Sequence, residues 1–369
     1  MKKILVLNPL KDLPYWGLTT HGINVFPRLP EDKFVSYAFF SNPSFAKGAL
    51  RQLPYSEGSS GVVTALREVR WMWRVRPDIL YGTGAIMELV YFVLRPRRAK
   101  YVIAWHGPYD KRWLLDIGNH SFRAKVSYYV ASCLLSRTDL LVCDSEFIAA
   151  SLRKHFPEKK VVVVLNGVDG VLFDPKKRDR KWLADRFSIP SDRPIFVFMG
   201  HLIRRKHPEI FAELARRTPE AFFVLAGKKG YYGDAEVAKW EKEAPNLHWF
   251  PPFPRDETAK LLASADALIF PSEEEPFGLA VVEALASGIP VIALRSGALP
   301  ELVRDGEEGF LIKEDGREIE AYHAAVRAIV HGGFRVEKMK DAARQRAALF
   351  AWEGVAARYE KAFSELMAG

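Results

Sequence analysis

Two glutamates, Glu275 and Glu283, bracket seven uncharged residues in the segment PSEEEPFGLAVVEALASGIP at 271–290. A short apolar run precedes them. A helix is predicted to begin near Pro276 or Phe277 and to end at the Ser-Gly pair, because helices favour proline at their first position and glycine just past their end. Acids favour helix starts for electrostatic reasons alone, which accounts for Glu275. It leaves Glu283, two turns inside an apolar helix, without a structural explanation.

The start of this helix could bind an anion. Backbone amides at a helix N-terminus have no partner inside the helix and carry positive partial charge, and Gly278 would let a phosphate approach the chain closely. A carboxylate repels a phosphate, so Glu275 and Glu283 are expected to bind neutral hydroxyl groups on either side of it. A ligand with hydroxyl groups on both sides of a diphosphate is a nucleotide sugar.

Parallel sheets would position these residues. Short apolar runs alternate with amphipathic stretches, pause at a turn-rich segment at 166–181, and then restart. Continuous apolar strands separated by helices are typical of a parallel sheet covered on both faces. The expected strands are 4–8, 34–40, 78–82, 101–105, 140–144 and 161–165, followed by 194–200, 222–227, 247–250, 267–270 and 290–294. The expected helices of the first half are 61–73, 84–94, 122–136 and 145–155.

We therefore predict an α/β fold with two Rossmann-like, doubly wound parallel-sheet domains. The first domain is expected to cover 1–170 and the second 171–351, which agrees with a length of 369 residues. A helical pattern at 352–369 could cross back to the first domain. Ligands of open parallel sheets bind beyond the carboxyl ends of the strands, so the expected site is a cleft between the two domains.

Four motifs occur in the order found in one known family. The segment 275–312 resembles the glutamate–seven–glutamate signature of retaining family-4 glycosyltransferases, which have the GT-B fold. Residues 196–215 are similar to the first strand and loop of that family's donor domain, 265–272 to the strand before the signature, and 166–169 to the interdomain segment. The resemblance implies a transferase that moves a sugar from a nucleoside diphosphate sugar to a hydroxyl acceptor, with retention of configuration.

The resemblance also implies roles for single residues of the signature. Glu275 would bind hydroxyl groups of the donor sugar, and Glu283 would bind the ribose. The backbone amides of Phe277, Gly278 and Leu279 would hold the sugar and the phosphates.

A cationic clamp for the diphosphate is expected after Gly200. The family has an arginine directly after this glycine and a lysine five residues later, where this chain has His201 and Lys206. A neutral imidazole is a poorer partner for a diphosphate than a guanidinium, so Arg204 or Arg205 is expected to supply the missing charge. A solvated surface loop is the alternative interpretation.

Three features of the first half are further candidates. The resemblance implies that His106, directly after a strand, faces the donor sugar; a structural histidine is the alternative. Gly17 matches the glycine-containing loop in which the diphosphate or the acceptor packs, although Trp16 replaces the usual second glycine, and His21 lies nearby. Three more glycines could face the cleft or be ordinary turn residues: Gly82, Gly84 and Gly297.

No Asp-x-Asp pair and no metal-ligand spacing occurs in the sequence. We therefore expect neither a metal nor a cofactor, and cationic side chains would stabilise the leaving diphosphate. The resemblance implies a catalytic set of His106, Lys206 and Glu275. The resemblance implies that this diphosphate acts as the base. A sugar-nucleotide epimerase of the same architecture is the alternative. A nicotinamide-dependent oxidoreductase would need a Gly-x-Gly-x-x-Gly after its first strand, which is absent.

The excess of basic over acidic residues is confined to the first half of the chain. Residues 1–169 contain 24 Lys and Arg against 14 Asp and Glu, whereas the remainder contains 30 against 31. The basic residues lie beside aromatic ones at 67–77, 95–100 and 111–115. This pattern suits an anionic membrane surface or a solvated face with some core tryptophans.

The expected partners are a UDP- or GDP-sugar and a glycan or lipid-linked acceptor, and no nucleic acid, since the chain has no motif for one. The first apolar run is too short for a signal peptide, and none is long enough to cross a bilayer. A cytoplasmic protein is expected, peripheral on the inner membrane face if its basic half binds lipid.

Overall fold

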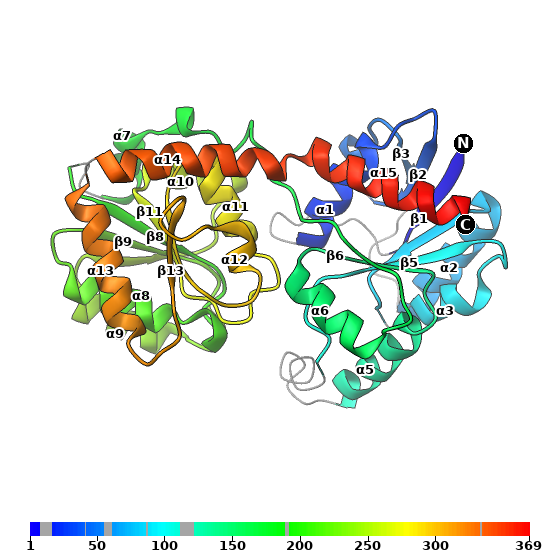
Figure 1. Cartoon of the computed structure of the whole chain (residues 1–369), viewed down its shortest axis with the longest axis horizontal. Helices are drawn as coiled ribbons and strands as arrows, with labels where there is room; N and C mark the ends of the chain where they lie inside the picture. The colour runs from blue at the N-terminus through cyan, green and yellow to red at the C-terminus, as the bar shows by residue number, and fades with distance from the viewer. Residues whose placement is uncertain are drawn as a thin grey trace. The chain divides into compact units, whose positions relative to one another are not determined.

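The structure is a computed structural model, and it describes residues 1–7, 17–40, 42–54, 61–85, 88–110, 122–188, 192–332 and 334–369. These residues form two compact units. Unit 1 consists of Met1–Asn166 together with Trp352–Gly369, and unit 2 is Gly167–Ala351. Each unit has its own parallel sheet with helices around it, which confirms the predicted fold class (Figure 1).

The sheet of unit 1 has the strand order β3-β2-β1-β4-β5-β6-β7, and all its pairs are parallel. Strand β3 is absent from the prediction because its sequence, LRQL, has only two apolar residues and two exposed polar ones at its centre. The strands are β1 (Lys2–Val6), β2 (Phe34–Phe39), β3 (Leu50–Leu53), β4 (Ile79–Gly82), β5 (Lys100–Trp105), β6 (Leu140–Cys143) and β7 (Val161–Val163).

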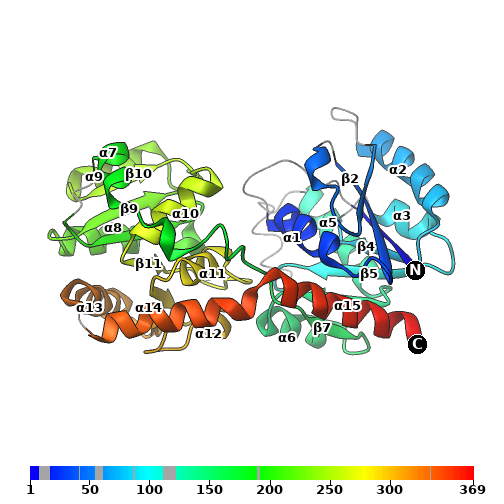
Figure 2. The same ribbon diagram turned by 90° about the horizontal axis from the view of Figure 1, so that it is seen from above.

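Alternating side chains of these strands build two cores, one on each face of the sheet. Ile4 and Val6 pack toward the face covered by α1 (Gly17–Val25) and α15 (Trp352–Ala368). The C-terminal helix α15 lies along one side of unit 1 (Figure 2) and supplies Tyr359 to this core. The opposite face is covered by α2 (Gly61–Val75), α3 (Glu88–Leu94), α5 (Phe122–Leu135) and α6 (Glu146–His155).

The sheet of unit 2 has the order β10-β9-β8-β11-β12-β13, again all parallel. Strand β13 is also absent from the prediction. It begins at Gly309, where a Cβ atom would lie 1.9 Å from the carbonyl oxygen of Val291, so this close pairing requires glycine. The strands are β8 (Ile195–Met199), β9 (Phe222–Ala226), β10 (Leu247–Phe250), β11 (Ala267–Phe270), β12 (Val291–Leu294) and β13 (Gly309–Ile312).

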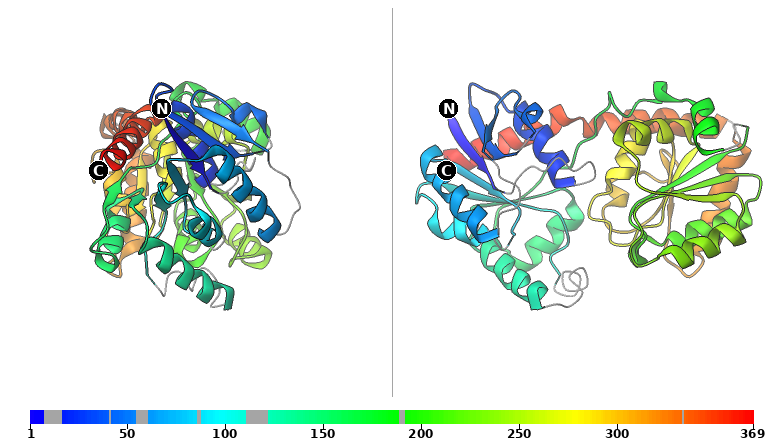
Figure 3. Two further views of the ribbon diagram at one scale, coloured as in Figure 1. Left: turned by 90° about the vertical axis from the view of Figure 1, so that its right-hand side faces the viewer. Right: turned by 180° about the vertical axis from the view of Figure 1, so that it is seen from behind.

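Helices cover both faces of this second sheet (Figure 3). One face packs against α8 (Pro208–Arg217), α9 (Asp234–Glu243) and α13 (Glu318–His331). Helix α11 (Leu279–Ala286) contacts β11 and β12 and packs against α10 (Arg255–Ser264) and α14 (Phe334–Ala347). The remaining elements are α7 (Arg180–Phe187), α12 (Leu299–Leu302) and the 3-10 segments η1 (Phe26–Arg28), η2 (Pro43–Phe45), η3 (Pro175–Lys177), η4 (Arg204–Lys206) and η5 (Ala348–Phe350).

Candidate functional site

The strand order of each sheet reverses at one point, between β1 and β4 in unit 1 and between β8 and β11 in unit 2. At such a point the loops after two adjacent strands run to opposite faces of the sheet, which leaves a crevice where ligands bind. In unit 2 the loop after β8 carries Lys206, and the loop after β11 carries Glu275. The backbone amide of Glu273 donates to the carbonyl of Arg205 at 2.8 Å and joins the two loops.

Glu275 is the centre of a buried polar cluster. Its Oε2 atom pairs with the ammonium of Lys206, accepts a hydrogen bond from the hydroxyl of Ser272 at 2.7 Å, and lies 3.6 Å from Arg205. Burial by itself would raise the pKa of Glu275, but the charges of Lys206 and Arg205 and the hydrogen bonds hold it below its ordinary value. Burial lowers the pKa of Lys206, and Glu275 opposes that effect. The carboxylate is therefore ionised at neutral pH.

The loop after β12 fixes the backbone at Glu275. The amide of Ala298 donates to the carbonyl of Glu275 at 2.8 Å. Its neighbour Gly297 has a φ of +58°, and a Cβ atom there would lie 2.4 Å from the nitrogen of Glu275. Gly297 is thus required by a close approach of two chain segments.

Helix α11 begins at Leu279, so the predicted start at Pro276 or Phe277 is wrong by two or three residues. The reason is Gly278, which caps the helix in the left-handed region with a φ of +104°. The ring of Phe277 is buried and packs against Phe350, with ring centroids 6.3 Å apart. The amides of Val281 and Val282 donate to the carbonyl of Gly278 at 2.9 and 3.3 Å, so the amides of the first two residues of α11, which follow the Glu275 loop directly, are those without an acceptor within the helix.

Glu283 lies on α11 with its side chain mostly buried and pairs with the guanidinium of Arg255, at the start of α10, at 3.2 Å. Burial raises the pKa of Glu283, and Arg255 opposes that effect. The pairing of Arg255 with Glu283 is not predicted from the sequence. The position of Arg255 after the turn FPPFP gives no signal of a partner 28 residues further along the chain.

The predicted clamp residues differ in their surroundings. Arg205 lies beside Glu275, whereas Arg204 is exposed and pairs with the ring and hydroxyl of Tyr231. His201 is exposed. Its partial burial, followed by the charges of Lys228, Lys206 and Arg205, lowers its pKa, so the imidazole is neutral at pH 7.

Gly200 follows β8, and its carbonyl oxygen would lie 1.7 Å from a Cβ atom on Gly227 after β9. The amide of Gly200 donates to the carbonyl of Ala226 at 3.1 Å. The ends of β8 and β9 therefore pack together more closely than two side-chain-bearing residues would allow.

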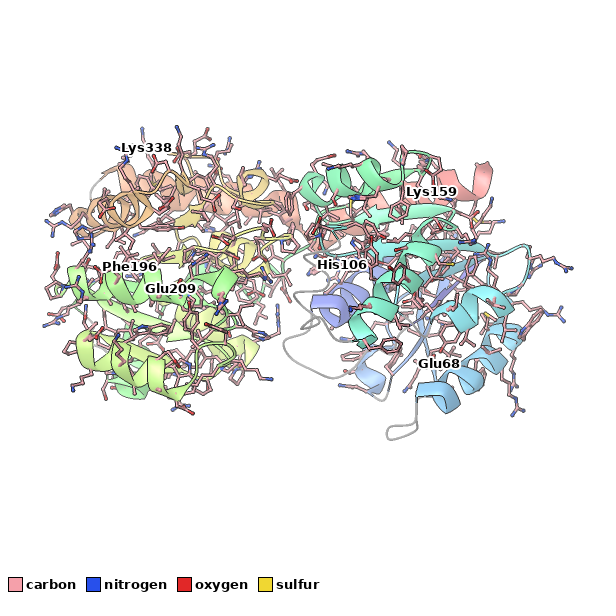
Figure 4. The ribbon with its side chains drawn as sticks, turned by 90° about the horizontal axis from the view of Figure 1, so that it is seen from below. Glu68, His106, Lys159, Phe196, Glu209 and Lys338 are labelled. Carbon is pink, nitrogen blue, oxygen red and sulfur yellow. The ribbon has the colours of Figure 1, made fainter. Side chains whose placement is uncertain are left out.

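In unit 1, His106 follows β5 and is labelled in Figure 4. Its Nδ1 atom lies 3.0 Å from Oδ2 of Asp144, directly after β6. The same carboxylate oxygen accepts from Nδ2 of Asn166 at 2.9 Å. Oδ1 of Asn166 lies 2.6 Å from Nδ1 of His21 on α1. This chain of four side chains links three strand ends and one helix, and the sequence predicted only its two histidines.

Gly17 is the first residue of α1, and the preceding loop with Trp16 lies outside the described residues. Gly82 and Gly84 surround the buried carboxylate of Glu88. A Cβ atom on Gly82 would lie 2.1 Å from Oε2 of Glu88, and the amide of Gly84 donates to that oxygen at 3.0 Å. Gly82 therefore makes room for a structural carboxylate, whereas a Cβ atom on Gly84 would lie 2.8 Å from the ring of Trp105. Within the described ranges, no three His, Cys, Asp or Glu side chains gather as a metal site would require.

Two doubly wound units, each with a strand-order reversal in its sheet, define a class of two-domain α/β protein whose ligands bind beyond the carboxyl ends of the strands. Residues 28–170 match the model described as "Glycosyltransferase Family 4", and residues 179–346 match "Glycosyl transferases group 1". Together the two matches extend through most of both units, and the chain belongs to this family of glycosyltransferases.

Among curated proteins, the chain is similar to D-inositol 3-phosphate glycosyltransferases. The one from Nocardioides is 29% identical over 259 residues, which cover 63% of this chain and 56% of that protein. One from Mycobacterium tuberculosis is 32% identical over 218 residues, covering 56% and 45%. The chain thus matches about half the length of these relatives.

Solved structures share the whole fold. Sucrose-phosphate synthase from Thermosynechococcus elongatus superposes with a TM-score of 0.79 over 100% of both chains at 19% identity. HepE from Anabaena, in complex with UDP and glucose, superposes with a TM-score of 0.76 over 99% of this chain and 100% of that one, at 18% identity. At such identities the likeness concerns the fold.

Proposed function

We propose that this protein transfers a sugar from a nucleoside diphosphate sugar to a hydroxyl group of a glycan or lipid-linked acceptor, with retention of configuration and without a metal ion. The observation that carries this proposal is the cluster of Glu275, Lys206 and Arg205 beyond the adjacent ends of β8 and β11. It combines a carboxylate that can accept hydrogen bonds from sugar hydroxyls with cations that can bind phosphate oxygens.

In this scheme Lys206 and Arg205 stabilise the charge that develops on the leaving diphosphate. An ammonium has three N–H donors. Lys206 can therefore keep its pair with Glu275 and also donate to a phosphate oxygen. Removing one such preorganised donor typically slows a reaction by about 10²–10³-fold. The leaving diphosphate would act as the base for the acceptor hydroxyl, on the same face of the sugar.

Glu283 and Arg255 would bind the nucleoside end of the donor. The Glu283 carboxylate accepts one contact from Arg255 and has further lone pairs for the two ribose hydroxyls. The amides at the start of α11, between the two glutamates, would hold the phosphates. A UDP-sugar is the first donor to test, because the Anabaena protein of the same fold was solved with UDP-glucose.

A direct test incubates the purified chain with UDP- and GDP-sugars in the presence of EDTA, with glycan, lipid-linked and inositol phosphate acceptors. The last acceptor is included because of the names of the curated relatives. We expect a glycosylated product with the anomeric configuration of the donor, observed by mass spectrometry and NMR. A sugar that changes stereochemistry on the nucleotide without transfer would instead indicate an epimerase, and a strict Mg²⁺ requirement would contradict the metal-free scheme.

We also propose that unit 1 contacts an anionic membrane from the cytoplasmic side. In the described part of the chain, no helix is long and apolar enough to span a bilayer. Helices α2, α3 and α5 pack side by side. They expose several large apolar side chains, and grouped apolar side chains on a surface mark contact sites for proteins or membranes. These residues are Trp73, Val93, Leu94, Phe122 and Tyr129. Three exposed arginines lie on and beside α2, at positions 70, 74 and 76. The basic and aromatic segment 111–115, which the sequence pattern also assigns to this surface, lies outside the described residues.

A further inference from the structure

We infer that Asp144, Asn166 and His21 are positioning residues that fix His106 as the Nδ1–H tautomer, so that its Nε2 atom accepts a hydrogen bond from a substrate hydroxyl. The identity of that substrate as a nucleotide sugar or its acceptor rests on the proposed function. The tautomer itself rests on the geometry of unit 1 alone.

The direction of each hydrogen bond follows from the carboxylate. Oδ2 of Asp144 has two neighbours, Nδ1 of His106 at 3.0 Å and Nδ2 of Asn166 at 2.9 Å. An ionised carboxylate can only accept, so both nitrogens must donate. A neutral imidazole carries one proton. When that proton is on Nδ1 of His106, the Nε2 atom is left with a lone pair.

The same argument continues to His21. Because Nδ2 of Asn166 faces the carboxylate, its Oδ1 faces Nδ1 of His21 at 2.6 Å, and an amide oxygen only accepts. His21 must therefore donate from Nδ1 as well. Its Nε2 atom is buried without a partner among the described residues. Burial lowers the pKa of His21 to about 3, so this ring is neutral. With its single proton on Nδ1, its Nε2 atom carries no proton and needs no acceptor.

The network is buried at His21, Asp144 and Asn166 and opens to solvent at His106. His21, Asp144 and Asn166 are 3%, 3% and 5% exposed, whereas the side chain of His106 is 22% exposed. The ring of His21 also meets the edges of Trp352 and Tyr359 on α15, with centroids 6.0 and 5.2 Å away. The hydrogen bonds among these buried groups hold each ring in one orientation, while Oδ1 of Asp144 and Nε2 of His21 are buried without a partner among the described residues.

A lone pair held at Nε2 of His106 determines which substrate groups can bind there. It accepts from a hydroxyl, and it repels the oxygens of a phosphate, which also carry lone pairs. His106 is thereby set to bind an uncharged hydroxyl of the donor sugar or of the acceptor.

The tautomers can be measured without any turnover. We would label the full chain with ¹⁵N in its imidazole rings and record long-range ¹⁵N–¹H correlations at pH 8, assigning the two rings among the nine histidines by their loss in His106→Gln and His21→Gln. We expect Nδ1 to be protonated and Nε2 to be unprotonated in both rings.

Asp144→Ala should shift His106 toward the Nε2–H form. The control Thr138→Val removes a buried hydroxyl that bonds the carbonyls of Tyr101 and Leu140, away from the network, and should change neither ring. A wild-type His106 protonated at Nε2, or one that Asp144→Ala leaves unchanged, overturns the inference.

Steady-state kinetics with UDP-glucose add an independent readout. Asp144→Ala should lower kcat/KM by about tenfold, as expected for a misdirected hydrogen-bonding group. Asp144→Asn keeps an oxygen that can accept from His106 and should restore most of this loss. Equal losses in both variants would contradict a positioning role. If even the wild-type chain turns over no nucleotide sugar, the proposed function fails, while the NMR result still decides the tautomer.

Discussion

The buried pair of Lys206 and Glu275 neutralises two charges that would each be costly alone. Removing one member of a buried ion pair typically costs about 3–5 kcal/mol, because the other is left uncompensated. Here Arg205 at 3.6 Å and the hydroxyl of Ser272 remain as partners of the carboxylate, which limits the cost of losing Lys206. Substitutions of Lys206 therefore test ligand binding, provided that folding is checked.

His207 makes the stability of this region depend on pH. It has a left-handed φ of 46°, and its ring nitrogens lie 2.8 Å from Glu209 and 2.8 Å from Glu273. The hydrogen bond to Glu209 and the charge of Glu273 raise the pKa of His207 despite its partial burial. A raised folded-state pKa adds stability that is complete below the unfolded value of about 6.5 and is lost as the pH rises through the folded value.

We expect His207→Gln to lower the melting temperature of the protein more at pH 6 than at pH 9, because only the protonated ring bridges the two carboxylates. Differential scanning calorimetry at both pH values measures the difference. His331→Gln, at an exposed helix end, is the control. An equal loss at pH 6 and pH 9 would show that the bridge does not depend on the proton.

At this scale the sequence predicted which residues lie near strand ends, including Lys206, Glu275 and His106. It could not predict Ser272, Arg255 or Asp144, because their roles arise from side-chain contacts between elements that only the folded sheet brings together. The choice of Arg205 rather than Arg204 beside Glu275 depends in the same way on the turn of η4.

At the scale of elements, three loops after β8, β11 and β12 converge on Glu275. The alternation of apolar runs predicted eleven of the strands, since each is a continuous hydrophobic segment. The two missed strands, β3 and β13, have short or glycine-initiated sequences whose pairing is defined by the neighbouring strand. The start of α11 was misplaced because the left-handed cap at Gly278, and not the proline, ends the incoming loop.

Gly297→Ala should weaken donor binding as well as destabilise the fold, because the added Cβ atom meets Glu275 in addition to straining the backbone. A residue other than glycine in the left-handed region costs on the order of 1 kcal/mol. The new Cβ atom would also meet the backbone of Glu275 at 2.4 Å. Gly316→Ala is the matched control, since its φ is +82° and nothing lies within 4 Å of the added atom. We expect both variants to melt at lower temperatures, and only Gly297→Ala to raise KM for the donor. Equal KM values in the two variants would count against the close approach at Glu275.

At the scale of the whole molecule, the C-terminal helix α15 belongs to unit 1 although its sequence follows unit 2. The amphipathic pattern of 352–369 predicted a helix and a possible return to the first half, and the aromatic side chains of α15 complete one core there. The uneven charge of the sequence was visible from composition alone. The arrangement of exposed large apolar side chains over α2, α3 and α5 was not, because it depends on which helix faces remain uncovered.

We expect the protein to co-sediment with vesicles that contain phosphatidylglycerol and to dissociate as salt is raised, since exposed charges are screened. Arg70→Glu with Arg74→Glu should weaken binding, because each basic residue near an anionic surface contributes about 1 kcal/mol. Lys239→Glu on α9 of unit 2 is the control. Binding that is independent of lipid charge, or equally weakened by the control, would remove the membrane proposal.

The central claim is that Lys206, paired with Glu275, binds the diphosphate of the donor. Isothermal titration of UDP into the wild-type chain, Lys206→Ala and Lys340→Ala tests it most directly, with circular dichroism as a check of folding. Lys340 is a suitable match because it pairs with Glu337 elsewhere in unit 2. We predict that UDP binds the wild type and Lys340→Ala equally and Lys206→Ala at least about tenfold more weakly, the effect of one charge-assisted hydrogen bond. Equal affinity of the folded Lys206→Ala variant for UDP would contradict the claim.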